Sequence, residues 1–302
     1  MPLQYESSLS RSLCLKPMTD TRETVLITGC TPGGIGHALA LEFHKQGARV
    51  FATARRIATL EDLRAQGIET LSIDVGDDDS VQAAAARYRE LTGGKLDILV
   101  NNAGRGYTTS VTDAEISEVT DLFNANVIGV VRMVRAFGPF VIAAKGKIVN
   151  NGSIAGTIAM PFRGTYGATK AAMHAMGDAL RLEMKPFGVQ VITLKTGAIL
   201  STGVNNDLVK TNSPHSIYAS IYPAVDQTTS AGAKDAMPTA QYAKRVVSTV
   251  LKPHPPAVYW YGKAAGFTWF LVTFVPRSIS DSIMSRVWSL TALSKELRKR
   301  RE

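Results

Sequence analysis

The sequence predicts an α/β fold: one doubly wound parallel sheet of about seven strands, helices on both faces and a C-terminal helical extension. From Thr24 onward, short runs rich in β-branched residues alternate with longer helical patterns, as in consecutive βαβ units. Hydrophobic residues make up 45% of the 302 positions, which is enough to cover both faces of such a sheet.

Strands and helices are expected to alternate from Thr24 onward, except across residues 200–238. Six strands are the runs TVLITG, ARVFAT, IETLSID, LDILVNN, KIVNN and VQVITLK, and a short seventh is expected at residues 257–260. Helical patterns cover residues 36–46, 58–66, 78–91, about 114–144, 165–185 and 239–252. In open sheets of this kind, ligands bind beyond the carboxyl ends of the strands, where the strand order reverses. Functional residues are therefore expected directly after the strands.

The chain divides into three expected parts. Residues 1–23 form an N-terminal extension that lacks the apolar core of a secretory signal, and residues 24–262 form the sheet domain. Within that domain, residues 200–238 are rich in Ser, Thr, Asn and Pro, and we expect an irregular lid over the site. Residues 263–302 form a tail that is first apolar and then basic.

Composition excludes some classes of function. The net charge of +9 is compatible with anionic ligands or membranes, but basic residues are not interleaved with aromatic ones along a strip, so no nucleic-acid partner is expected. Cys14 and Cys30 form neither a disulfide framework nor a metal-binding spacing. We expect an intracellular protein without a metal site.

A glycine-rich turn, TGCTPGGIG at residues 28–36, lies between the first strand and the first helix. Its glycines permit close approach to a pyrophosphate at the helix N-terminus, as in Rossmann-type domains. Arg55 and Arg56 follow the second strand, where NAD-selective sites carry a carboxylate. Because guanidinium groups pair well with phosphate, we expect NADP(H); the alternative is two arginines that merely face solvent.

Tyr166 and Lys170 are four residues apart in a helical pattern, and Ser153 follows a predicted strand 13 residues before Tyr166. Residues four apart share one helix face, so the ammonium would lie beside the phenol and favour its ionised form. Tyr166 could then exchange a proton near neutral pH, with Ser153 binding a substrate oxygen. The alternative for the pair alone is a solvated helix face with one packed ring.

These motifs together resemble the short-chain dehydrogenase/reductase family over residues 24–260. The carrying features, in the family's order, are the glycine turn, Asp74-Val75, Asn101-Asn102-Ala103-Gly104, Asn126, Ser153 and Tyr166-x-x-x-Lys170. The resemblance implies that Tyr166 donates the proton, Lys170 binds the nicotinamide ribose and lowers the pKa of Tyr166, Ser153 holds the carbonyl oxygen and Asn126 anchors a water.

The resemblance also implies a cofactor site. Besides Arg55 and Arg56, it comprises Gly29, Thr31, Gly33, Gly34, Ile35, Asp74, Val75, Asn102, Ala103, Gly104, Tyr166, Lys170, Ile199 and Ser201. The sequence departs from the family pattern in having one additional residue in the glycine turn and Thr196-Gly197 in place of Pro-Gly. Either Ser201 or Thr202 matches the threonine that follows, and spacing favours Ser201.

The segments GKLDILVNNAG, EMKPFGVQVI, AMPTAQYAKRVV and FTWFLVTFVP are similar to those of fungal NADPH-dependent 1-acyldihydroxyacetone-phosphate reductases. This similarity implies reduction of 1-acyldihydroxyacetone phosphate to 1-acylglycerol 3-phosphate, with Lys195, Arg163 or Arg105 available for the phosphate. One alternative is the same chemistry on another bulky apolar ketone, such as a fungal secondary metabolite, polyketide, terpenoid or steroid. A different class is a non-redox, cofactor-binding scaffold at a membrane.

The tail segment AAGFTWFLVTFVP, residues 264–276, is uncharged and aromatic. It is shorter than the roughly 20 residues that span a bilayer, but with the basic end SKELRKRRE it is compatible with a membrane interface. The chain is expected to be intracellular, and either cytoplasmic or peripheral on the membrane of endoplasmic reticulum or lipid droplets. Alternatively, Phe267, Trp269, Phe270 and Phe274 pack over the cleft or on another subunit. The resemblance implies a homodimer or homotetramer formed through residues 114–144 and 165–185.

Overall fold

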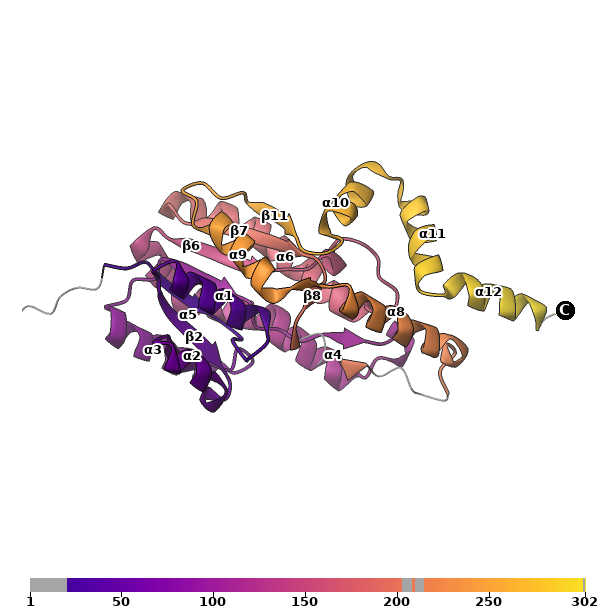
Figure 1. Cartoon of the computed structure of the whole chain (residues 1–302), viewed down its shortest axis with the longest axis horizontal. Helices are drawn as coiled ribbons and strands as arrows, with labels where there is room; N and C mark the ends of the chain where they lie inside the picture. The colour runs from indigo at the N-terminus through magenta and orange to yellow at the C-terminus, as the bar shows by residue number, and fades with distance from the viewer. Residues whose placement is uncertain (1–20, 203–207, 210–214, 301) are drawn as a thin grey trace, which may run out of the picture.

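A computed structural model of the chain describes residues 21–202, 208–209, 215–300 and 302. Most of the expected N-terminal extension, with Cys14, and part of the expected lid lie outside these residues. The main sheet has seven parallel strands in the order β11-β7-β6-β4-β1-β2-β3 (Figure 1). The strands are β1 (Thr24–Ile27), β2 (Arg49–Ala54), β3 (Glu69–Ser72), β4 (Ile98–Asn101), β6 (Lys147–Asn151), β7 (Gln190–Thr196) and β11 (Val258–Tyr261). The predicted fold class is confirmed.

Helices cover both faces of the sheet because successive strand residues point to opposite sides. In β1, Val25 and Ile27 enter one core, whereas Leu26 enters the other. The first core includes α1 (Ile35–Lys45), α2 (Glu61–Ala65) and α9 (Thr239–Val250). The second includes α3 (Asp78–Thr92), α5 (Gly129–Ala144) and α6 (Gly164–Met184).

Strand order reverses beside β1. The chain runs from β1 through β2 to β3 on one side, and then from β4 through β6 and β7 to β11 on the other. In open sheets with this reversal, ligands bind at the carboxyl ends of the strands on either side of it. The expected glycine turn follows β1, directly at this point.

The helix expected over about 114–144 is divided into α4 (Ile116–Phe123), a π-helical turn η3 (Asn124–Ile128) and α5. This continuous helical stretch, Ile116–Ala144, is long and apolar enough to cross a membrane by length and composition. Its residues Met133, Phe137 and Val141 are nevertheless buried against the sheet, as in a core helix. The pattern at 58–66 is a 3-10 turn, η1 (Ile57–Leu60), followed by α2.

The expectation of an irregular lid is wrong for part of residues 200–238. This segment contains η6 (Ala219–Ile221) and the helix α8 (Tyr222–Lys234), with a proline in the first turn of α8, where its missing N–H has no helical partner to lose. Its ends are joined because β8 (Ile199–Leu200) pairs in parallel with β10 (Met237–Pro238). A second short pair links β5 (Tyr107–Thr108) to β9 (Leu208–Val209).

The tail forms three helices, α10 (Ala265–Phe274), α11 (Arg277–Val287) and α12 (Leu290–Lys299), as expected of a helical extension. They extend beside the sheet domain in Figure 1. The tail packs on the lid through a third apolar cluster, hereafter the lid cluster. Its buried members are Phe162, Ile221, Tyr222, Val225, Trp288 and Leu293.

Candidate active site

A chain of hydrogen bonds connects the carboxyl ends of β1, β4, β6 and β7. Asn102 Nδ2 donates to the carbonyl oxygens of Thr28 (2.8 Å) and Gly29 (3.1 Å), and Asn102 Oδ1 accepts from Asn151 Nδ2 (2.8 Å). Asn151 Oδ1 in turn accepts from Thr196 Oγ1 at 2.7 Å. Such a connected polar network fixes the relative positions of the four strand ends.

The glycine turn after β1 has the geometry that a pyrophosphate requires. Gly29 and Gly33 have φ of 72° and 75°, a region that side chains other than glycine rarely adopt. A Cβ on Gly29 would lie 2.9 Å from Ala103 Cα, so the turn also needs glycine for space. Helix α1 begins at Ile35 with Gly34 as its N-cap and no side-chain cap, which leaves the helix N-terminus accessible to an anion.

The loop after β8 lies against this turn. Thr202 donates from its backbone N to Gly33 O at 3.2 Å and from Oγ1 to Pro32 O at 3.1 Å. Ser201, the position favoured by spacing, is buried, as is Ile199. The structure therefore places Thr202, rather than Ser201, beside the glycine turn, and Thr31 lies exposed within the turn.

Arg55 and Arg56 lie immediately after β2 and are both exposed. Their backbones are fixed, since Ser72 Oγ donates to Arg55 O at 3.1 Å and Thr59 Oγ1 donates to Arg56 O at 2.7 Å. Two guanidinium groups are thus available near the end of the strand that follows α1. This chemistry fits a phosphate on the ribose better than a hydroxyl.

Asp74 and Val75 follow β3. Asp74 Oδ1 accepts from the backbone N of Gly76 at 2.9 Å, which closes a local turn. Val75 is buried against Gly129, where an added Cβ would lie 3.0 Å from Val75 Cγ2. The turn therefore positions the segment after β3 against the start of α5.

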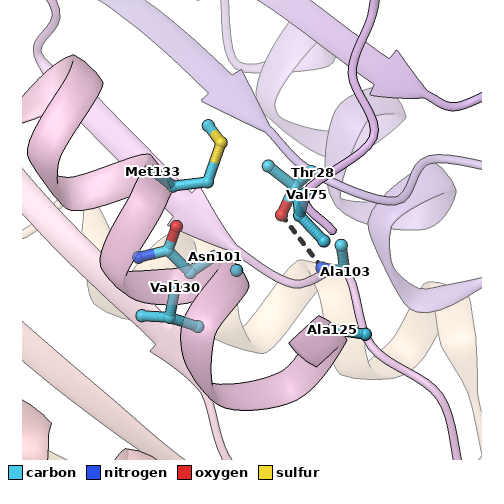
Figure 2. A pocket seen from close by; sticks show the side chains of 8 residues that line it. Thr28, Val75, Asn101, Ala103, Ala125, Val130 and Met133 are labelled. Atoms are coloured by element: carbon cyan, nitrogen blue, oxygen red, sulfur yellow. Dashed lines mark hydrogen bonds between the residues drawn. The ribbon is translucent and has the colours of Figure 1, made fainter. Parts of the chain in front are cut away.

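Figure 2 shows a small pocket beneath the loop after β4. It is lined by Thr28, Val75, Asn101, Ala103, Ala125, Gly129, Val130 and Met133. Thr28 Oγ1 accepts from the backbone N–H groups of Asn102 and Ala103, both at 2.9 Å. This hydroxyl therefore anchors the loop that contains three of the expected cofactor-binding residues.

Tyr166 and Lys170 lie in the first two turns of α6. Lys170 Nζ lies 5.8 Å from the centroid of the Tyr166 ring and donates to Asn151 O at 3.0 Å. The side chain of Lys170 is buried, and this burial lowers its pKa from 10.5 to about 8. An ammonium group is consequently fixed beside the phenol, as the spacing predicts.

Ser153 begins the 3-10 turn η4 (Ile154–Gly156), and its Oγ accepts from Ala155 N at 3.1 Å. This turn packs closely on α6. A Cβ on Gly156 would lie 2.7 Å from the carbonyl carbon of Lys170, and one on Gly167 would lie 2.7 Å from Ala155 O. Glycine at both positions allows the turn that carries Ser153 to meet the N-terminal part of α6.

Asn126 lies in the π-helical turn and is fully buried. Its Oδ1 accepts from Arg105 N at 2.9 Å, and its Nδ2 donates to Arg105 O at 3.0 Å and Thr169 Oγ1 at 3.1 Å. A Cβ on Gly104 would lie 2.9 Å from Asn126 Oδ1 and 3.8 Å from Lys170 Nζ. Asn126 therefore joins the loop after β4 to α6. We refer to Asn102, Asn126, Asn151, Ser153, Tyr166 and Lys170 together as the strand-end site.

Two further residues of this arrangement, Asn151 and His174, are not among those expected from the sequence. Asn151 could have been found because it is polar and ends an otherwise apolar strand that leads to Ser153. His174, four residues after Lys170, is buried and accepts from Ser153 N at 3.4 Å through Nε2. Burial, with the nearby Lys195 and Lys170, lowers the pKa of His174 to about 3, so its ring is neutral.

The remaining candidates are spread around the site. Arg105 forms ion pairs with Glu118 (2.7 Å) and Asp121 (3.4 Å), and Lys195 Nζ lies 6.0 Å from the Trp260 ring centroid. Among the described residues, no group of three or more His, Cys, Asp or Glu side chains is placed to hold a metal ion.

The chain is similar in sequence and in fold to known short-chain dehydrogenases. Residues 23–213 match the family model for short chain dehydrogenase. A short-chain dehydrogenase of Pyricularia oryzae is 39% identical over 275 residues, which cover 89% of this chain and 95% of the relative. The NADPH-dependent 1-acyldihydroxyacetone phosphate reductase of Schizosaccharomyces pombe is 43% identical over 180 residues, 60% of this chain and 61% of that protein. A solved short-chain dehydrogenase from Streptomyces avermitilis has 26% identity and a TM-score of 0.73, and covers 92% of this chain and 99% of its own.

Proposed function

Because the chain belongs to the short-chain dehydrogenase family, we propose that this oxidoreductase is an NADPH-dependent reductase of a bulky, apolar ketone. The observation that carries the proposal is the position of Lys170, whose Nζ lies 5.8 Å from the centroid of the Tyr166 ring and donates to Asn151 O at the end of β6. The apolar, aromatic lid cluster favours a ketone of the secondary-metabolite, polyketide, terpenoid or steroid-like kind.

The residues of the site have separate tasks in this reaction. NADPH, when bound, supplies the hydride to the carbonyl carbon. Tyr166 donates its phenolic proton to the carbonyl oxygen, and the Lys170 ammonium favours the phenolate that this leaves. Ser153 donates a hydrogen bond to the same oxygen and orients the ketone, while Asn126 anchors a water that returns a proton to Tyr166.

Each part of the cofactor matches the chemistry of residues that follow one of the strands. The glycine turn and the N-terminus of α1 would bind the pyrophosphate. Arg55 and Arg56 would pair with the 2′-phosphate, and Asp74 and Val75 would contact the adenine side. Asn102 and Lys170 would bind the ribose groups, and Thr202 would adjoin the pyrophosphate.

A panel of ketones, with and without long acyl chains and phosphate, tests the function directly. We expect oxidation of NADPH with bulky apolar ketones and much weaker turnover of small ones. Absence of NADPH oxidation with every ketone would contradict the proposal and favour a cofactor-binding scaffold without redox turnover.

The second candidate substrate is 1-acyldihydroxyacetone phosphate. The Schizosaccharomyces pombe reductase supports it, although this chain spans only 61% of that protein. Lys195 is the better candidate for the phosphate than Arg105, because Arg105 already pairs with two carboxylates. Lys195→Ala should raise KM for the acyl-ketone phosphate and leave KM for an uncharged ketone unchanged; equal effects on both would argue against phosphate binding.

We also propose that α10 lies in a membrane interface, on the cytoplasmic surface of endoplasmic reticulum or lipid droplets. Phe267, Trp269, Phe270 and Phe274 are 45–62% exposed on this one helix, and α12 carries basic side chains that could meet anionic headgroups. The ten residues of α10 are too few to span a bilayer.

Sedimentation with phospholipid vesicles tests this surface. We expect the chain to sediment with anionic vesicles more fully than with zwitterionic ones, and the triple variant Phe267→Ser, Trp269→Ser and Phe270→Ser to remain in solution. If the triple variant sediments as fully as the parent chain, α10 is not the membrane contact.

The likeness to the family further supports a homodimer or homotetramer formed through α4 to α6. Ile128, Val131 and Leu182 are exposed on these helices, at 46%, 48% and 61%. Light scattering should give a mass at least twice that of the chain, and Val131→Glu with Leu182→Glu should reduce it. A monomeric parent chain would contradict this assembly.

A further inference from the structure

Arg163 lies beside the ring of Tyr166. Its Cζ atom is 5.1 Å from the ring centroid, closer than the 5.8 Å of Lys170 Nζ. Two cationic side chains therefore approach one phenol. A cation within about 6 Å of an aromatic centroid interacts favourably with the ring, and more strongly still when the ring carries negative charge.

The backbone around Arg163 is firmly fixed. Phe162 has a positive φ of 61°, an unusual conformation for a phenylalanine, and its carbonyl oxygen accepts from Thr109 N at 2.7 Å. The ring of Phe162 is buried in the lid cluster, 5.3 Å from Tyr218 and 6.1 Å from Trp288 between centroids. Gly167 N donates to Arg163 O at 2.7 Å. A strained backbone conformation such as that of Phe162 persists where the surrounding contacts enforce it. Here these contacts fix the backbone from which the Arg163 side chain extends.

Three charged side chains on the elements around α6 have other partners. On the α4 side, Arg105 pairs with Glu118 and Asp121. On the lid side, Asp113 accepts hydrogen bonds from Ser216 and Tyr222. On the β7 side, Lys195 interacts with Asp178, and His174 is neutral.

Arg163 and Lys170 also differ in how they keep their charge. Burial lowers the pKa of Lys170 to about 8, so Lys170 loses its charge as the pH rises through this value. An arginine side chain stays protonated throughout this range. Above pH 8, Arg163 would thus be the permanent positive charge beside the phenol.

We propose that Arg163 is a second cation for Tyr166, which acts together with Lys170 to favour the ionised phenol. Arg163 is a positioning residue, since it acts through Tyr166 and not on the ketone. Its role rests on the proposed function of Tyr166 as the proton donor.

Titration of the tyrosinate absorbance tests the proposal without substrate or cofactor. The signal of Tyr166 is the difference between the parent chain and Tyr166→Phe, and the same difference is measured with Arg163→Met in both chains. We expect Arg163→Met to raise the pKa of Tyr166 by about one unit and Arg163→Lys to shift it much less, because Lys keeps the charge. Arg87→Met, which removes an exposed charge on α3, should cause no shift.

Kinetics give a second, directional measurement. Alcohol oxidation needs the phenolate, so Arg163→Met should slow oxidation near neutral pH about tenfold while ketone reduction changes little. An unchanged titration of Tyr166 in Arg163→Met, or an equal shift in Arg163→Lys, would overturn the proposal. If no ketone is turned over by the parent chain, the proposed function fails, and the titration still decides whether Arg163 acts on Tyr166.

Discussion

The strand-end site and the C-terminal helices α10 to α12 differ in how their side chains are satisfied. In the site, Asn126, Asn151 and Lys170 are buried, and each makes hydrogen bonds to a neighbouring element. On α10, the rings of Phe267 and Phe274 are 58% and 62% exposed. The polar groups of the site thus find partners within the sheet domain, whereas the described residues leave the rings of α10 exposed.

This contrast assigns different properties to the two regions. The family model matches residues 23–213, which include the whole strand-end site and none of α10 to α12. Substitutions in the site should therefore change turnover of every ketone. Substitutions in the tail should change which ketone is accepted, or where the chain binds.

The largest expected effect is that of Tyr166→Phe. Without its proton donor, the site should reduce ketones about a thousandfold more slowly, since general acid catalysis contributes roughly 10²–10⁴-fold. NADPH oxidation measures the rate, with vesicle binding and thermal unfolding expected to stay unchanged. Tyr259→Phe removes a hydroxyl near the start of β11 that accepts from Arg245, and it should have little effect. Undiminished turnover in Tyr166→Phe would contradict the assignment.

Replacement of Arg55 and Arg56 by alanine tests the cofactor end of the same site. Loss of charge-assisted hydrogen bonds to a 2′-phosphate should raise the Kd for NADPH roughly 10–100-fold and leave the Kd for NADH nearly unchanged. Titration calorimetry with both nucleotides measures this difference. Arg64→Ala, on the exposed face of α2, is the matched control. Equal weakening of both nucleotides would argue against selectivity for NADP(H).

Two tryptophans distinguish the packed part of the tail from its exposed part. Trp288 is buried in the lid cluster, so Trp288→Ala should leave a cavity, loosen α11 and α12 and raise KM for a bulky ketone several-fold. Trp269→Ala, on exposed α10, should leave KM unchanged and weaken vesicle binding. Hydrogen exchange of the tail and ketone kinetics measure both. Identical effects of the two changes would show that the tail acts as one unit.

The effect of His174 is the smallest near neutral pH and becomes visible only at acid pH. Its pKa is about 3 in the folded chain and 6.5 for the unperturbed group, so the unfolded chain binds more protons between these values. Stability should fall as the pH is lowered from 6.5 towards 3, by up to ~1.4 kcal/mol per pH unit. Denaturant unfolding at several pH values should show a flatter dependence for His174→Gln. The exposed His254→Gln is the control, and an unchanged slope in His174→Gln would contradict the assignment.

Most of the fold follows from the sequence because buried parallel strands and amphipathic helices leave strong patterns. The runs TVLITG and KIVNN mark strands that are buried on both faces, and Tyr166 and Lys170 lie together because a helix brings residues four apart onto one face. The expected positions of these elements differ from the structure by only a few residues.

The rest depends on contacts between distant segments. The helix α8 has the weakly patterned sequence YPAVDQTTSAGAK, and its burial depends on Trp288, which lies more than 50 residues further along the chain. Ser201 and Thr202 are neighbours of similar chemistry, so only the fold shows that Thr202 meets the glycine turn. The position of Arg163 depends on the positive φ of Phe162, and no local sequence pattern predicts this conformation for a phenylalanine.

The π-helical turn at Asn124–Ile128 is expected to lower the stability of the helix while it supports turnover. Here Gly129 N donates to Asn124 O, five residues back, so the helix contains one residue more than a regular α-helix needs. Removal of one residue in this turn would restore regular pairing between α4 and α5 and would be expected to raise the temperature of unfolding. The same deletion would rotate Asn126 away from Thr169 and slow the reaction. The irregular turn is thus a position at which a more heat-resistant chain would be a poorer catalyst.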